Sequence, residues 1–276
     1  MIIHHLLLTY FGILFLVLIL FRIVEPTYMM IFNKPLYLYL YPFPKKLSLT
    51  QKQILEKEFP FYKKLSNKKK IYFEHRVKGF LNHYQFIGKE ELLVTDEMKI
   101  IIAGTYIMLT FGMRQYLINL FKVIIIYPSA YFSNSNQQYH KGEFNPAMKA
   151  VAFSWEDFIL GHQSTNDNIN LGLHEFAHAL HFHGMKSNDP SAILFFDEFN
   201  KVITYFKDEK LNKKLSEQGY FREYAYENGF EFIAVILEHF FETPHLFKSK
   251  YPELYQHVSS MINYNEKNFD ELLESN

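Results

Sequence analysis

Residues 174–178 read His-Glu-Phe-Ala-His, and this HExxH pattern stands inside an apolar run. Side chains four residues apart lie on the same face of an α-helix. The sequence therefore predicts an amphipathic helix over about residues 168–183 that presents His174 and His178 together, with Gly184 as its C-cap. Two imidazoles at this spacing can bind one metal ion from one side.

Glu175 follows the first histidine and is expected beside the metal position rather than on it. A carboxylate in this place can act as the general base that takes a proton from an attacking water molecule. The alternative is an ordinary core helix whose histidines are hydrogen-bonded and bind no metal. Glutamate and histidine are seldom buried together without a reason, which favours the metal site.

A third ligand is needed, because catalytic zinc sites use three protein ligands and keep one position for water. The chain has no cysteine, so this ligand is His, Asp or Glu. His181 shares the face of the motif, but three ligands on one straight helix cannot easily surround a tetrahedral ion. We expect the ligand on a second apolar helix, residues 230–241, which carries Glu231 and Glu238 on one face. Spacing alone leaves both open, and either glutamate can instead be hydrogen-bonded to a core side chain.

The two segments resemble the paired HEFAH and EFFAV signatures of the Mlc titration factor A (MtfA) family of zinc peptidases. The first signature corresponds to residues 174–178 and the second to residues 231–235. The likeness spans roughly residues 50–260 and continues, in the family's order, through Val94–Met98, Ile124–Pro128 and Phe153–Asp157. The resemblance implies a zincin-like fold, one Zn²⁺ per chain held by His174, His178 and Glu231, and hydrolysis of a peptide or protein substrate with Glu175 as general base.

The chain is similar, more distantly, to the catalytic domain of anthrax lethal factor, which has a functional tyrosine seven residues before its zinc-binding glutamate. That position is Tyr224 here, and Tyr226 is a nearby alternative. A tyrosine hydroxyl can donate to the oxyanion of a tetrahedral intermediate. Two departures concern support of the metal: His181 stands where the family usually has Asp, and Val235 where lethal factor has a second Glu. Glu238 is a candidate for that supporting role.

The resemblance also implies a function of another class. The family's name records sequestration of a transcription repressor, so a regulatory binding protein is the alternative to an active peptidase. Formal net charge is zero, which gives no case for direct nucleic-acid binding. An inactive relative with structural zinc is disfavoured because Glu175 is present.

Residues Leu6 to Val24 form an apolar stretch that, at about 1.5 Å per residue, can just cross a bilayer. We predict a single-pass membrane anchor rather than a signal peptide or a buried helix, because no Lys or Arg precedes the stretch and no small-residue cleavage site follows it. The nearby Lys and Arg lie at its C-terminal end (Arg22) or after it (Lys34, Lys45 and Lys46). The positive-inside rule then places the peptidase domain on the cytoplasmic side of the inner (cytoplasmic) membrane.

The predicted organisation is an anchor (1–24), a Pro- and Tyr-rich extended linker (25–48) and a metallopeptidase domain (49–276). The linker could instead contain a short strand over 36–41. The domain is expected to be α+β, with helices predominating over a small sheet. Its predicted elements are helical regions over 48–88, 95–121 and 252–273 and strands over 124–127 and 150–154. The last strand is either internal or an edge strand that pairs with an extended substrate.

Overall fold

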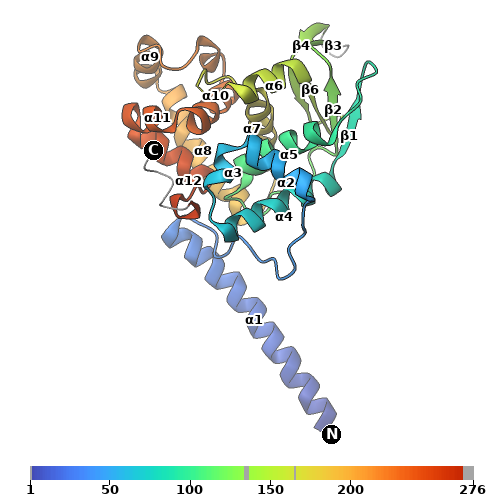
Figure 1. Ribbon diagram of the computed structural model, residues 1–276. Helices are drawn as coiled ribbons and strands as arrows, with labels where there is room; N and C mark the ends of the chain where they lie inside the picture. Colours follow the sequence, from blue (N-terminus) through green and yellow to red (C-terminus); the bar gives the residue numbers. More distant parts are fainter. Residues whose placement is uncertain (1, 134–136, 165, 270–276) are drawn as a thin grey trace.

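The computed structural model describes residues 2–133, 137–164 and 166–269 (Figure 1). A long helix, α1 (Ile2–Phe32), projects from a mostly helical domain that carries its strands at one side. The mostly helical α+β architecture expected from the sequence is therefore confirmed. The domain contains helices α2 (Leu49–Glu58), α3 (Pro60–Lys64), α4 (Asn67–His83), α5 (Asp96–Thr110), α6 (Trp155–Gln163), α7 (Leu171–Gly184), α8 (Pro190–Lys207), α9 (Glu209–Glu217), α10 (Gly229–Glu242), α11 (Pro244–Lys250) and α12 (Pro252–Met261), with 3-10 turns η1 (Glu223–Tyr226) and η2 (Glu266–Asn268).

The sheet has four strands in the order β1-β2-β6-β5. These are β1 (Gln85–Gly88), β2 (Val123–Tyr127), β6 (Ala150–Ser154) and β5 (Gly142–Asn145). The first three run parallel, and β5 pairs antiparallel with β6 at the edge. A separate hairpin joins β3 (Tyr131–Ser133) and β4 (Gln138–His140).

Strand β6 is internal, so the interpretation of residues 150–154 as the substrate-pairing edge is wrong and the internal alternative is correct. All five of its residues are buried. A strand covered on both faces and paired on both sides has this near-continuous apolar sequence. The edge position belongs to β5, which lies beside α7.

Three predicted helical regions differ from the helices of the structure. The region predicted over 95–121 ends at Thr110, because the backbone at Gly112 approaches Ile262 and Asn263 so closely that a Cβ atom at position 112 would clash with their carbonyl oxygens. The region predicted over 48–88 divides into α2, α3 and α4, with Pro60 beginning α3, and ends in strand β1. The C-terminal helix ends at Met261, and residues 270–273 of its predicted extent lie outside the described residues.

Helix α7 carries the HExxH residues through the centre of the core. Its N-cap is Asn170, whose side chain accepts a hydrogen bond from the Leu173 amide at 3.0 Å. Gly184 was expected to end the helix as a C-cap, but it lies inside α7, and the chain leaves through Met185 in a right-handed helical conformation. Phe176 packs on four rings (Phe80, Tyr106, Phe121 and Phe153) that fix the helix in the core.

Helix α1 is long and apolar enough to cross a membrane, and a signal sequence near an N-terminus meets the same criterion. Residues 3–19 are exposed throughout. The sequence predicts an extended linker from Glu25, but the helix continues through Pro26 to Phe32. Its end is held on the domain by an ion pair between Glu25 and Arg114, which accounts for the extra turns. No strand forms over 36–41, a segment that the structure describes in full.

Candidate metal centre

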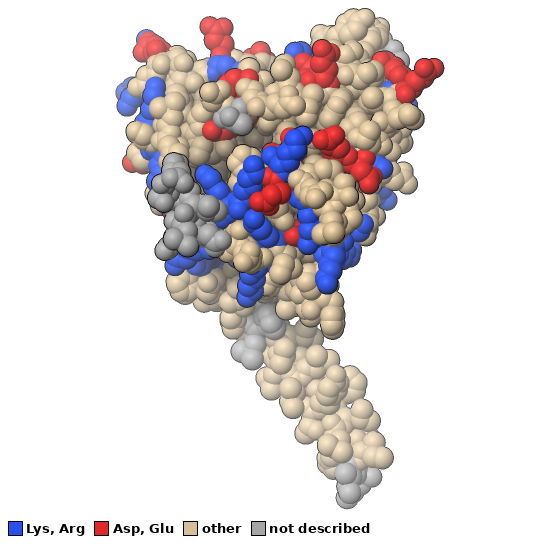
Figure 2. All heavy atoms as spheres, viewed as in Figure 1, with Lys and Arg blue, Asp and Glu red and all other residues tan. Residues whose placement is uncertain are grey.

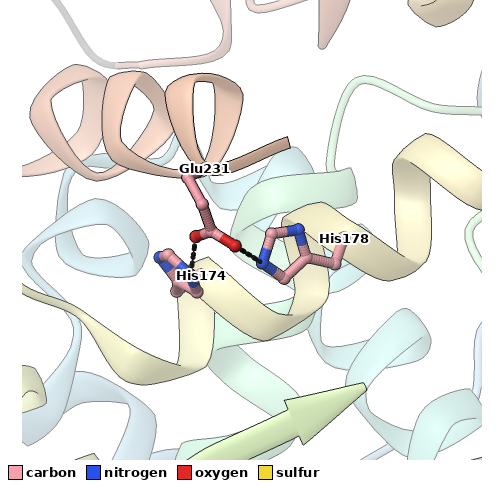
Figure 3. A group of neighbouring side chains, drawn as sticks. All are labelled: His174, His178 and Glu231. Carbon is pink, nitrogen blue, oxygen red and sulfur yellow. Dashed lines mark ion pairs between the residues drawn. The ribbon is translucent and has the colours of Figure 1, made fainter. Parts of the chain in front are cut away.

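Helices α7 and α10 pack against each other and bring three side chains together (Figure 3). His174 and His178 come from α7, and Glu231 comes from the first turn of α10. His174 Nε2 lies 2.9 Å from Glu231 Oε2, and His178 Nε2 lies 3.6 Å from Glu231 Oε1. One nitrogen or oxygen from each residue lies within 4.8 Å of the other two. The structure thus places the three sequence-predicted ligands side by side.

The spacing of these atoms fits a small tetrahedral ion. A zinc ion with ligand bonds of about 2.0–2.1 Å needs its ligand atoms about 3.3 Å apart. The two distances to Glu231 lie on either side of this value. Two imidazoles and one carboxylate are also the ligand set of many catalytic zinc sites. The residues present therefore fit the metal.

Glu238 contacts the His174 ring on the side opposite Glu231. Its Oε1 lies 2.7 Å from His174 Nδ1, which leaves Nε2 of that ring to face Glu231. The two terminal nitrogens of the Arg222 guanidinium donate hydrogen bonds of 2.6 and 2.9 Å to the Glu238 carboxylate. The Asn170 amide donates a third hydrogen bond to it, at 3.2 Å. A carboxylate bonded to the second nitrogen of a metal-binding histidine fixes its tautomer and orientation. The geometry assigns Glu238 to this support and not to the ligand set.

Arg222 is a functional residue that sequence reasoning missed. The signal was available in part: Glu238 is fully buried, and a buried carboxylate requires a cation or several donors. Nothing in the local sequence says which cation it is. Arg222 is sixteen residues away along the chain, and only the turn before α10 brings it to Glu238.

His181, the other candidate for support, packs among aromatic rings, and its Nδ1 has no hydrogen-bond partner within the described part of the chain. Its ring lies 4.1 Å from the ring of Phe199 and 4.8 Å from that of Phe230. Burial in this apolar setting lowers the pKa of His181 to about 4, so the imidazole is neutral near pH 7. It therefore adds no positive charge against the metal.

The site is electrostatically arranged around His174. Burial lowers the pKa of His174, but hydrogen bonds with Glu231 and Glu238 outweigh it and raise the pKa to about 10. Burial and the charge on His174 lower the pKa of His178 to about 4. Without metal, the His174 imidazole is therefore protonated at neutral pH, and its positive charge lies between the carboxylates of Glu231 and Glu238.

Glu175 lies beside this group and is 7% exposed. Its Oε2 accepts a hydrogen bond of 2.9 Å from the Phe144 amide on the edge strand β5. Burial raises the pKa of Glu175 to about 7, against the opposing effects of the His174 charge and the Phe144 hydrogen bond. Gly142 makes this approach of strand and helix feasible, because a Cβ atom there would stand 2.7 Å from Glu175 Oε1. A carboxylate with a pKa near 7 is suited to accept and return protons.

Tyr224 lines the cleft, whereas Tyr226 does not. The Tyr224 ring lies 5.8 Å from that of His174, and its side chain is 41% exposed. Burial and the neighbouring Glu231 carboxylate raise the pKa of Tyr224 above its usual value, so the hydroxyl remains a donor at neutral pH. Tyr226 instead packs near Phe232.

A cavity of about 460 Å³ opens beside these residues, between the β4–β5 segment and helices α6 and α7. His174, Glu175 and Tyr224 form one wall, and Leu160, Ile169 and Leu171 give another part an apolar lining. Edge strand β5 borders the same cavity through Gly142. The cavity thus lies next to the Glu175 carboxylate and to His174, one member of the cluster that could hold a metal ion.

Comparison with known proteins agrees with this geometry. The family described as glucose-regulated metallo-peptidase M90 matches residues 41–262. An uncharacterized protein of Synechocystis sp. (strain ATCC 27184 / PCC 6803 / Kazusa) is 24% identical, over 79% of this chain and 89% of that protein. Mlc titration factor A of Yersinia pestis (strain Pestoides F) is 26% identical, over 64% of this chain and 71% of the relative. Metallopeptidases require a metal, and the chain contains a cluster able to hold one. The match covers most of the chain, and the protein belongs to the glucose-regulated metallo-peptidase M90 family, that of the MtfA-like proteins.

Proposed function

We propose that this protein is a zinc-dependent peptidase tethered to the cytoplasmic membrane by α1, with a zincin-like catalytic domain facing the cytoplasm. The observation that carries the proposal is the convergence of His174, His178 and Glu231 next to the buried carboxylate of Glu175. Membership of a metallopeptidase family supports the reaction class. The length and apolar composition of α1 support the anchor, and the lysines and arginines that follow it support the orientation.

The residues divide the reaction between them. His174, His178 and Glu231 would hold the zinc ion, which when bound acidifies water and polarises the scissile carbonyl. Glu175 takes a proton from the attacking water and passes it to the leaving amine, a role suited to its raised pKa. Tyr224 donates a hydrogen bond to the developing oxyanion. Glu238 and Arg222 keep the His174 ring oriented throughout.

The substrate is proposed to bind as an extended peptide along β5. This strand is an edge strand of the described sheet and borders the cavity at Gly142, although the amide of Phe144 already donates to Glu175. An extended chain that adds to a sheet edge is bound by main-chain hydrogen bonds, which are independent of side-chain identity. Selectivity would then come from the wall formed by Leu160, Ile169 and Leu171, which favours an apolar substrate side chain.

The decisive experiment is cleavage of a mixed peptide library by the full chain in detergent with added zinc. Glu175→Gln preserves the shape of the site and removes the base, so we expect cleavage to fall by at least about 10²-fold. Glu143→Gln is the matched control, since this neighbouring carboxylate on β5 does not line the cavity. Unchanged cleavage by the Glu175→Gln protein would sink the proposal.

A regulatory binding function is the second candidate. It is favoured by one observation, the similarity to Mlc titration factor A, whose name refers to titration of another protein. Pull-down with Glu231→Gln, which removes a proposed ligand, separates the two candidates. A protein that is captured equally by this variant binds a surface apart from the metal centre. Capture of no protein by the intact chain counts against the regulatory function.

A further inference from the structure

Helix α1 contacts the domain from the point along the helix where its apolar stretch ends. Glu25, the first residue after that stretch, pairs with Arg114, and Arg114 also pairs with Asp189 at 3.2 Å. The Arg114 guanidinium lies 4.8 Å from the centre of the Tyr37 ring. Asn33 adds a hydrogen bond of 2.8 Å to Glu198. If α1 crosses a bilayer, these contacts hold one face of the domain at the height of the lipid headgroups.

The segment that follows, residues 34–47, is named here the juxtamembrane loop. It has no regular secondary structure, yet hydrogen bonds to the domain fix its path. The Tyr41 hydroxyl accepts a hydrogen bond of 2.8 Å from Arg76, and the Tyr39 hydroxyl donates to the Phe111 carbonyl at 2.8 Å. The Lys45 amide donates to His75 Nδ1 at 2.8 Å. Contacts with the domain therefore determine the conformation of the juxtamembrane loop.

Arg76, the centre of this attachment, is completely buried and pairs with no carboxylate among the described residues. Its guanidinium instead donates to the carbonyls of Thr110 and Phe111, at 3.0 and 3.1 Å. These carbonyls lie at the C-terminal end of α5, where the helix dipole favours a positive charge; they also accept hydrogen bonds from the Met113 amide and the Tyr39 hydroxyl. The buried cation thus ties the juxtamembrane loop to a helix end in the core.

The same loop displays large apolar side chains to the outside. Phe43 is 90% exposed and Leu40 is 76% exposed, and exposed Lys45 and Lys46 follow directly. Figure 1 shows the loop, in blue before α2, hanging from the domain on the side from which α1 projects. Figure 2 shows α1 without charged side chains on its visible face and many Lys and Arg side chains on the domain above it. Apolar tips next to lysines are suited to an anionic lipid surface.

We propose that the juxtamembrane loop is a second membrane contact: Leu40 and Phe43 enter the interfacial layer of the bilayer crossed by α1, and Lys45 and Lys46 bind anionic headgroups. The proposal rests on the membrane anchor of the proposed function. Two contacts, the helix and the loop, prevent the domain from turning about α1. The cavity beside α6 and β5 then stays on the side of the domain away from the bilayer (Figure 1).

The absence of cysteine allows a direct test, because every introduced cysteine is the sole labelling site. The full chain carrying Phe43→Cys, or separately Leu40→Cys, is labelled with an environment-sensitive fluorophore. It is reconstituted into vesicles of phosphatidylcholine and phosphatidylglycerol that contain lipids with a quencher near the headgroup. Leu93→Cys is the matched control, since Leu93 is 85% exposed but lies in the β1–α5 connection, away from α1 (Figure 1). Leu14→Cys, near the middle of the apolar stretch of α1, reports the anchor itself in vesicles whose lipid quencher lies at the end of the acyl chains.

We expect quenching at positions 14, 40 and 43 and none at 93. Quenching at 43 should weaken in vesicles of phosphatidylcholine alone, and Lys45→Gln with Lys46→Gln should remove this difference. Quenching at 14 without quenching at 40 or 43 would overturn the loop proposal and leave the anchor standing. No quenching at 14 would overturn the anchor and the loop together. A label at 43 that is shielded from soluble iodide but not quenched by lipid would show a protein contact, which also overturns the proposal.

Discussion

Arg222 acts on the metal centre through another residue, Glu238, which in turn holds His174. Removal of the guanidinium would leave a fully buried carboxylate without its cation. A buried charge in that position shifts or takes up a proton, and the His174 ring loses its fixed orientation. The effect of Arg222 should therefore appear in metal binding before it appears in any catalytic step.

We predict that Arg222→Ala weakens zinc binding by about 10–100-fold. The zinc affinity of Arg222→Lys should lie between those of the wild type and Arg222→Ala. An ammonium group keeps the charge but cannot donate to both carboxylate oxygens in the bidentate geometry of a guanidinium. Competition with a chromophoric chelator measures the affinity without reference to activity. Lys141→Ala is the control, a cleft cation that pairs with Asp157 and does not contact Glu238. Folded Arg222→Ala protein with unchanged affinity would contradict the role.

Glu242 makes a different prediction, for the pH dependence of stability. Burial raises the pKa of Glu242 to about 7, and its Oε2 accepts a hydrogen bond of 2.7 Å from the Asn168 amide. The folded protein thus keeps a proton that the unfolded chain releases at lower pH. The stability contributed by this site is present below the usual carboxyl range and is lost as the pH rises through about 7.

Glu242→Gln should therefore stabilise the protein at pH 8, by about 1–2 kcal/mol, and leave stability near pH 4 unchanged. Glutamine keeps the acceptor for the Asn168 amide and carries no charge. Urea unfolding at the two pH values measures the difference. Glu227→Gln, at an exposed position, should change neither value. Equal stability of wild type and Glu242→Gln at pH 8 would show that folding does not raise the pKa of this carboxyl.

At the scale of elements, periodicity was sufficient for the two helices that make the site. The apolar pattern around the HExxH residues predicts α7, and an acid on the apolar face of a second helix identifies α10. The choice of Glu231 over Glu238 came from family resemblance, because seven-residue spacing places both on one face. The local apolar pattern therefore predicts the helices. The role of each carboxylate depends on which side chains of other elements lie next to it in the fold.

Features that depend on distant segments could not be read from the sequence. The end of α5 is set by residues 262–263, which are far away along the chain. Strand β5 is short and reads as a loop, although it is the sheet edge that contacts Glu175. Alternation along a strand does not reveal which neighbours it has, and so the sequence left open whether residues 150–154 form an edge strand or, as in the structure, an internal one.

The spacing between β5 and α7 gives a prediction at this scale. Gly142→Ala would place a Cβ atom 2.6 Å from Leu171 Cδ1 and 2.7 Å from Glu175 Oε1, so the strand or the carboxylate must move. We expect peptide cleavage to fall by about 10²-fold through misplacement of the base. Zinc affinity should stay unchanged, because Glu175 is outside the ligand group. Glu143→Ala is the neighbouring control; full activity of Gly142→Ala would show that the close approach has no catalytic role.

At the scale of the whole molecule, the question is where the folded domain begins. The sequence places the start at residue 49, after a linker, whereas the family match begins at residue 41. The juxtamembrane loop supplies Tyr39 and Tyr41 to the surroundings of Arg76, and Leu47 to the core. Although the loop has no regular secondary structure, we expect these contacts to contribute to the free energy of unfolding of the domain.

A chain beginning at residue 34 should therefore be more stable than one beginning at residue 49. In the shorter chain Arg76 lacks its hydrogen-bond partner Tyr41, and the core lacks Leu47. Water then reaches the Arg76 guanidinium and the space that Leu47 fills. We therefore expect the free energy of unfolding to fall by at least about 2 kcal/mol. Urea unfolding of both chains, each freed of the apolar helix, measures it. Phe43→Ser in the longer chain is the control, because an exposed side chain contributes little to folding. Equal unfolding free energies would mean that the loop only rests on the domain, and the membrane contact at Phe43 would then lose its rigid support.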